Sequence, residues 1–204
     1  MRKLILPIGL LSAAVLAFAP AHAQLRGHGG PVHGLAVSPD GKSAISGSFD
    51  SSAISWSLSR NVAEQVLRFH ESAVKAVAFG PNGRIITGGE DGRIALWAPG
   101  GETPVRVLEG HTAPVVALAV SPDGKMFASA SWDRTIRVWP FAGGKPYVFE
   151  GHQQNVNGVA FMPNGKTFVS VSYDLTLRIW PLFGGAPTIV TLPTPLNAVA
   201  IARS

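Results

Sequence analysis

Four residue types recur four times in the same order, a histidine, a serine or threonine, an aspartate and a tryptophan. Successive histidines of the series are 42, 41 and 41 residues apart, and successive tryptophans are 41, 42 and 41 apart. The four sets are His28, Ser46, Asp50 and Trp56; His70, Thr87, Asp91 and Trp97; His111, Ser129, Asp133 and Trp139; and His152, Ser170, Asp174 and Trp180. A fixed period of roughly 20 to 50 residues indicates stacked repeats that share one continuous core.

Each repeat contains the pattern of four β-strands. An alternating apolar segment such as Val115 to Val120 predicts the first strand, and a Pro-Asp-Gly or Pro-Asn-Gly turn follows it. A second strand reaches the serine or threonine, a turn carries the aspartate, a third strand ends at the tryptophan, and a more polar fourth strand leads to the next histidine. Four strands joined as a meander form one blade of a β-propeller. The predicted fold class is therefore an all-β propeller with four complete blades, over residues 25–66, 67–107, 108–148 and 149–190, plus the first strand of a fifth within 191–204.

These motifs resemble the WD-repeat family of β-propellers, over the chain from about Leu25 to its end. Two departures leave the spacing intact: no Asp follows the repeated tryptophans, and Phe69 replaces the glycine before His70. The resemblance implies that the His, Ser/Thr, Asp and Trp of each blade form a hydrogen-bonded network that holds its loops together. A catalytic triad would occur once, in a cleft, so we interpret the sixteen repeated residues as structural.

Other chemistry finds no support in the sequence. The chain contains no cysteine, which excludes disulfides, thiolate metal sites and covalently attached haem. The repeated histidines lie on different blades, with no pair at the spacing of metal ligands. No glycine-rich phosphate loop is present. We expect no catalytic residues, no metal and no cofactor, and hence no enzyme.

The resemblance also implies where a partner binds. In the family, the residue before each blade aspartate is a recurrent contact position, and polar residues near the start of the inner strands border the same entrance. The candidate residues are Phe49, Glu90, Trp132 and Tyr173, with His33, Lys75 and Asn157 beside them. Exposed aromatic side chains are favoured binding anchors. We expect a protein or peptide partner.

Residues 1–23 have the pattern of a cleavable signal peptide. Arg2 and Lys3 precede an uncharged apolar stretch, and Ala21-His22-Ala23 fits the small-x-small cleavage site. The stretch is shorter than the roughly 20 residues of a membrane-spanning helix. We expect cleavage before Gln24, a periplasmic location and no membrane association afterwards. Removing Arg2 and Lys3 lowers the net charge from +5 to +3, which is too small to indicate a nucleic-acid surface.

The number of blades leaves three interpretations open. A seven-bladed ring at this period needs roughly 290 residues, more than the chain has. The chain is the front part of a longer protein, or it closes a ring with copies of itself, or it forms a small four-bladed ring. We favour the first.

A closer resemblance supports that choice. The segments at residues 29–32, 48–54 and 192–200 resemble exported proteobacterial proteins that join WD repeats to a C-terminal cytochrome c domain. Such relatives bind haem through a Cys-x-x-Cys-His motif, which this chain lacks, so an electron-transfer role would belong to residues outside it. The alternative functions are therefore the propeller half of a periplasmic c-type cytochrome, or a non-functional gene remnant.

Overall fold

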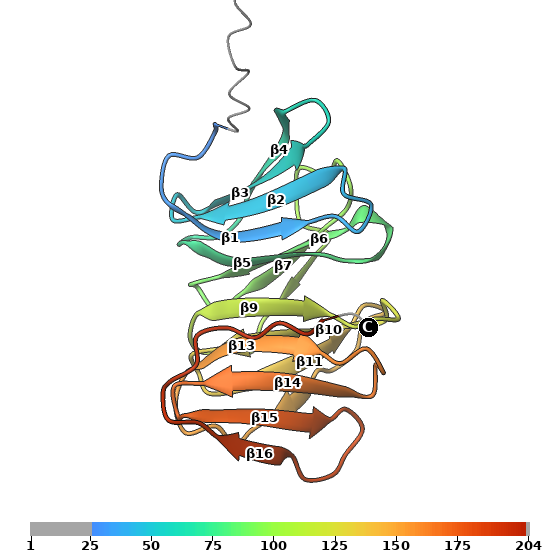
Figure 1. The fold of residues 1–204 in the computed structure, drawn as a ribbon. Coiled ribbons are helices and arrows are strands. Elements are labelled where there is room, and N and C mark those ends of the chain that lie inside the picture. The colour runs from blue at the N-terminus through green and yellow to red at the C-terminus, as the bar shows by residue number, and fades with distance from the viewer. Residues whose placement is uncertain (1–25, 203–204) are drawn as a thin grey trace, which may run out of the picture.

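The computed structural model describes residues 26–202, which form four antiparallel sheets of four strands each (Figure 1). In every sheet the strands follow one another as a meander. Blade 1 contains β1 (Val32–Val37), β2 (Ser43–Ser48), β3 (Ser52–Ser57) and β4 (Val62–Arg68). Blade 2 contains β5 (Val74–Phe79), a short 3-10 turn (Pro81–Gly83), β6 (Ile85–Gly89), β7 (Ile94–Trp97) and β8 (Arg106–Leu108). Blade 3 contains β9 (Val115–Val120), β10 (Met126–Ser131), β11 (Ile136–Pro140) and β12 (Tyr147–Phe149). Blade 4 contains β13 (Val156–Phe161), β14 (Thr167–Ser172), β15 (Thr176–Pro181) and β16 (Thr188–Thr191).

The turns between the first two strands explain why each blade begins as a hairpin. In blade 3 the Asp123 carboxylate accepts hydrogen bonds from the Ser121 hydroxyl at 2.7 Å and from the Lys125 amide at 3.0 Å. Gly124 then adopts a φ of 66°, which costs glycine little. The turn chemistry predicted from the sequence therefore fixes the register of β9 against β10.

The hydrophobic core lies between blades. The face of a blade that carries the tryptophan is here called its rear face. In blades 2, 3 and 4 the rear face packs against the opposite, front face of the preceding blade. Between blades 3 and 4, Trp180 and Phe168 on the rear face of blade 4 are in one cluster with Ile136 and Val138 of blade 3. Equivalent clusters join blades 1 and 2 and blades 2 and 3. Each blade is thus stabilised by its neighbours, as expected for stacked repeats.

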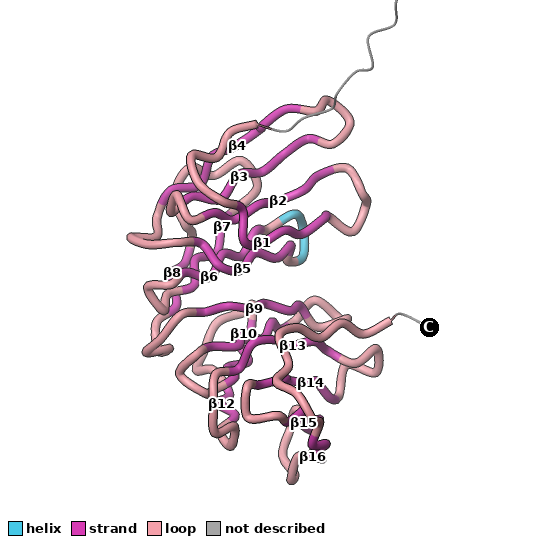
Figure 2. Tube along the Cα trace, turned by 60° about the vertical axis from the view of Figure 1, so that its left-hand side comes forward, coloured by secondary structure: helices cyan, strands magenta, loops and turns pink. Residues whose placement is uncertain are grey.

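The four blades form an open arc, with blade 1 and blade 4 at its two ends (Figures 1 and 2). Adjacent inner strands lie side by side, β1 against β5, β5 against β9 and β9 against β13. The described residues therefore confirm the all-β fold of four complete blades, and they do not form the small four-bladed ring that the sequence left open.

The predicted first strand of a fifth blade is in its place but forms no ladder. Residues 193–202 have no strand assignment, because no strand of the described chain pairs with them. They nevertheless lie against β13 as one inner strand lies against another. A side chain on Gly158 would meet the backbone of Ala198 and Val199, as one on Gly34 of β1 would meet that of Lys75 and Ala76 in β5. Residues 196–201 are called the tail below.

The predicted signal peptide and its cleavage site lie outside the described residues. Within residues 26–202, no helix is long and apolar enough to cross a membrane.

Candidate functional site

The four repeated residue types come together in every blade as one hydrogen-bonded network. In blade 3, Trp139 Nε1 donates to Ser129 Oγ at 2.9 Å, and Ser129 Oγ lies 2.8 Å from His111 Nε2. His111 Nδ1 lies 2.7 Å from Asp133 Oδ2. The histidine therefore joins the second strand to the turn carrying the aspartate.

The direction of each hydrogen bond in the network follows from the groups at its two ends, the aspartate carboxylate and the tryptophan indole. A carboxylate only accepts, so the histidine Nδ1–H donates to it. In the neutral ring Nε2 then accepts from the hydroxyl, whose oxygen is free to accept from the indole N–H. Every buried polar atom of the network has a partner in this arrangement, which is the condition for burying polar groups without cost to stability.

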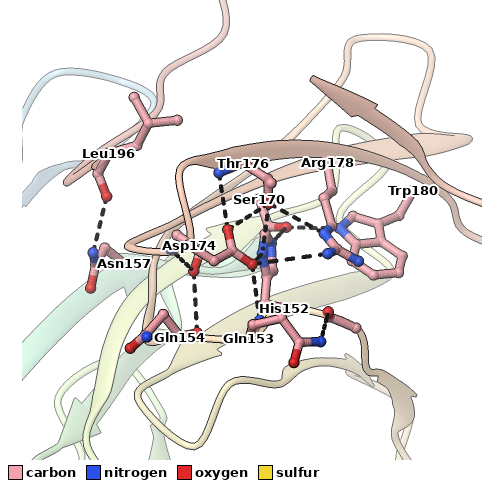
Figure 3. Close-up of polar contacts among 12 residues, drawn as sticks. His152, Gln153, Gln154, Asn157, Ser170, Asp174, Thr176, Arg178, Trp180 and Leu196 are labelled. Atoms are coloured by element: carbon pink, nitrogen blue, oxygen red, sulfur yellow. Dashed lines mark hydrogen bonds and ion pairs between the residues drawn. The ribbon is translucent and has the colours of Figure 1, made fainter. Parts of the chain in front are cut away.

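Figure 3 shows the network of blade 4, where its electrostatics are clearest. His152 Nδ1 lies 2.8 Å from Asp174 Oδ2, and both side chains are more than nine-tenths buried. Burial lowers the pKa of His152, and the hydrogen bond to Asp174 opposes that effect without cancelling it. For Asp174, burial raises the pKa, but hydrogen bonds from Thr176, the Gln153 amide and His152 outweigh it and hold the pKa well below its usual value.

The structure adds hydroxyl groups that the sequence analysis missed. One lies two residues before the aspartate and donates to a loop carbonyl; the other lies two residues after it and donates to the carboxylate. In blade 3, Ser131 Oγ donates to the Ala113 carbonyl at 3.0 Å and Thr135 Oγ1 donates to Asp133 at 2.7 Å. The full set is Ser48 and Ser52, Ser131 and Thr135, and Ser172 and Thr176. Their recurrence on the period of 41 residues was the available signal.

Blade 2 departs from this pattern at both positions. Gly89 and Arg93 stand where the other blades have hydroxyl residues. A Cβ on Gly89 would collide with His70 and Asp91, so the network here leaves no room for a side chain. The Asp91 carboxylate still accepts from His70 and from the Arg93 amide, at 3.0 Å each.

The networks have no exposed nucleophile. Ser129 and Ser170 are both fully buried and each already contacts an indole N–H and an imidazole. A hydroxyl held in this way can neither reach nor attack a substrate. Among residues 26–202, no group of three histidine or acidic side chains is placed to hold a metal ion.

The residues before the four aspartates share one position in the fold. Their backbone N–H groups all donate to the loop that leads into the inner strand: Phe49 to Pro31, Glu90 to Ala73, Trp132 to Pro114 and Tyr173 to Asn155, at 2.8 to 3.1 Å. All four side chains are exposed, with Phe49 48%, Trp132 38% and Tyr173 45% accessible. We call this surface the entrance face.

The polar residues expected beside the entrance face are largely engaged within the protein. Lys75 is buried, with its Nζ 4.1 Å from the centre of the Phe49 ring and 3.9 Å from Glu90 Oε1. Asn157 donates to the Leu196 carbonyl at 3.0 Å and so holds the tail (Figure 3). His33 is exposed, and its ring centre is 5.6 Å from that of Phe49. These three residues also line a hollow of about 320 Å³ between the inner strands and the tail.

Comparison with protein families agrees with this geometry. The family model of the WD domain, G-beta repeat, matches residues 20–57, 62–98, 102–140 and 143–181. These matches cover most of the chain, one for each blade, so the protein belongs to the WD-repeat family of β-propellers. A search of curated proteins found no significant match.

Proposed function

We propose that this WD-repeat protein is a non-catalytic scaffold that binds a protein or peptide at the entrance face. Three half-exposed aromatic side chains at one repeated position carry the proposal. Aromatic residues are enriched among the residues that dominate binding energy, because they bury a large area at a small entropic cost. The networks supply what such a surface needs, since the turn holding each aromatic is tied to the body of its blade.

The chemistry of the entrance face favours a partner that is partly apolar. Phe49, Trp132 and Tyr173 offer apolar area, whereas the exposed Glu90 carboxylate lies 3.9 Å from the buried Lys75 Nζ, which offsets part of its charge. The exposed His33 ring adds a polar group next to Phe49. A ligand with one or two large apolar side chains and a polar backbone suits this surface better than a highly charged one.

The test is a peptide selected from a random library against the protein, followed by titration of two double variants. Replacing Trp132 and Tyr173 by alanine should weaken binding by at least about 30-fold, the effect of losing a hot spot. The matched control replaces Tyr147 and Phe183, an exposed aromatic pair 6.4 Å apart on the strands and loops of blades 3 and 4. Equal affinity for the Trp132/Tyr173 variant and the parent protein would refute the assignment of the entrance face.

Export is a second part of the proposal. The signal-peptide pattern of residues 1–23 supports a periplasmic location, and the lack of cysteine supports a function without bound haem. The alternative, a propeller part of a c-type cytochrome, predicts a larger product that carries haem. Intact mass measured on the native protein separates them: the mass of residues 24–204 supports the exported scaffold, and a larger haem-bearing mass supports the cytochrome.

A further inference from the structure

Blade 1 exposes a set of apolar side chains that the other blades bury. On β1, Val32 is 54% and Leu35 69% accessible. The residues equivalent to Val32 in the other blades are at most 1% accessible, and two of those equivalent to Leu35 are at most 8%; they are Val74, Val115 and Val156, and Val77 and Val159. The difference arises because a front face covers the rear faces of blades 2, 3 and 4, and no described residue does so for blade 1.

The uncovered rear face has the shape of a binding site. Val32 and Leu35 line a mostly apolar hollow of about 490 Å³ with Gly27 and Trp56. Trp56 lines this hollow, and its equivalents Trp97, Trp139 and Trp180 belong to the hydrophobic clusters of the three blade junctions. An apolar patch of this kind marks an interaction surface.

Blade 4 exposes the complementary half of a junction. Val190 of β16 is 41% accessible. At the same position, Leu67 of β4 is 1% accessible, and Leu108 of β8 and Phe149 of β12 are half-buried. The neighbouring Ile189 behaves differently. It is 50% accessible, and its equivalents Val66, Val107 and Val148 are exposed in every blade. Val190 is therefore exposed because no described blade covers it, whereas Ile189 lies at a position that is exposed in every blade.

We propose that the occupant of the open rear face is the front face of blade 4 in a second copy of this chain. The three junctions within residues 26–202 all join a rear face to a front face, and these residues leave one face of each kind uncovered. Two such junctions related by a two-fold axis close a ring of eight blades, within the usual range of about four to eight. This proposal is independent of the entrance face. It takes up the second interpretation of the blade count, closure with copies of the chain, whereas the first, a longer protein, predicts that further blades cover both faces.

The tail occupies the place that β1 of the second copy would take. Leu196, Val199 and Ile201 repeat the spacing of Val32, Leu35 and Val37. The tail is held to blade 4 by the bond from Asn157 to the Leu196 carbonyl and by one from the Leu196 amide to the Ser172 carbonyl, at 3.4 Å. A single unpaired strand buries less apolar area than a four-stranded blade, so the second copy displaces it.

The experiment measures mass by sedimentation at increasing concentrations of the chain lacking residues 1–23. We expect a shift from one chain to two, and no larger species. Leu35→Asp on the rear face and Val190→Asp on the front face should each weaken association by at least about 30-fold. The matched controls Val66→Asp and Ile189→Asp should leave it unchanged within about 3-fold, because these positions are exposed in every blade.

Mixing the two disrupted variants gives the sharpest outcome. In a pair of one Leu35→Asp chain and one Val190→Asp chain, both charges fall in one junction and the other junction is intact, so association returns in part. Val199→Asp should strengthen association, because it releases the tail. A single chain at all concentrations up to about 100 µM, longer open oligomers, mixing without recovery, or weaker association of Val199→Asp would each overturn the proposal. Circular dichroism of every variant shows that it is folded.

Discussion

Replacing Asp133 by alanine tests whether the hydrogen-bonded network stabilises its blade. The Asp133 carboxylate accepts four hydrogen bonds: from His111 Nδ1 at 2.7 Å, the Thr112 amide at 3.2 Å, the Thr135 amide at 2.9 Å and the Thr135 hydroxyl at 2.7 Å. The His111 side chain is fully buried, so water cannot replace its lost acceptor. The Thr112 amide is exposed and can bind water instead.

These contacts set the size of the expected effect. An unsatisfied buried donor costs about 1 to 3 kcal/mol, and hydrogen bonds to a charged group contribute about 1.5 to 3 kcal/mol each. The bonds share one acceptor and one of them is solvated, so they are not additive. We expect Asp133→Ala to lower the free energy of unfolding by about 3 to 5 kcal/mol.

The matched control is Asp123→Ala. Asp123 accepts hydrogen bonds from Ser121 and Lys125, in an exposed turn of the same blade. Water replaces those bonds, so we expect a loss of about 1 kcal/mol or less. Urea unfolding followed by circular dichroism compares the two variants. An Asp133→Ala protein no less stable than Asp123→Ala would refute a stabilising role for the network.

Three further changes test related features of the blades. Ser129→Ala should cost about 2 to 4 kcal/mol, because it leaves Trp139 Nε1 without its acceptor in a dry site; unfolding in urea measures it, and an unchanged midpoint would contradict the donor order given above. Arg134→Gly should stabilise the protein by about 0.5 to 1 kcal/mol, because exposed Arg134 has a φ of 72° where blade 2 has Gly92; a lower melting temperature would count against this. Lowering the pH should destabilise the fold in two steps. The pKa of His152 is lowered from 6.5, so the stability that its neutral form contributes is lost as the pH falls below that value. The pKa of Asp174 is also lowered, so the stability that its carboxylate contributes is lost below about pH 4. Greater stability at pH 5 than at pH 7 would contradict the first step.

Most of the fold could be predicted from the sequence, because the residues that define each blade interact within one repeat. A turn such as Ser121 to Lys125 sets one hairpin, and a tryptophan and its hydroxyl partner ten residues apart pair across two adjacent strands. The four blades could therefore be placed from the spacing, whereas the hydrogen bonding among the network residues was implied by the resemblance to WD-repeat proteins. The hydroxyl pairs at Ser131 and Thr135 escaped notice because serine and threonine are common in turns, and only their recurrence distinguishes them.

Features that depend on contacts between blades could not be predicted in this way. Lys75 is buried beneath Phe49 of the preceding blade, and Asn157 holds the tail, so neither is the open polar border expected from the sequence. The open arc likewise could not be predicted, because it depends on how one blade packs against the next. Nothing in the sequence pattern of Val32, Leu35 and Val37 distinguishes them from their equivalents in later blades, which are buried or half-buried.

The network nearest the open end of the arc is more exposed than those of the other blades, and we expect this exposure to link folding to assembly. The side chains of His28 and Asp50 in blade 1 are 5% and 18% accessible, against 0% and 6% for His111 and Asp133 in blade 3. A front face docked on blade 1 would cover this residual exposure and exclude the water that competes for the same hydrogen bonds. Binding that favours the folded state raises stability by mass action. Asp50→Ala should therefore cost less than Asp133→Ala in a dilute single chain, and the difference should shrink as concentration rises and the junction forms.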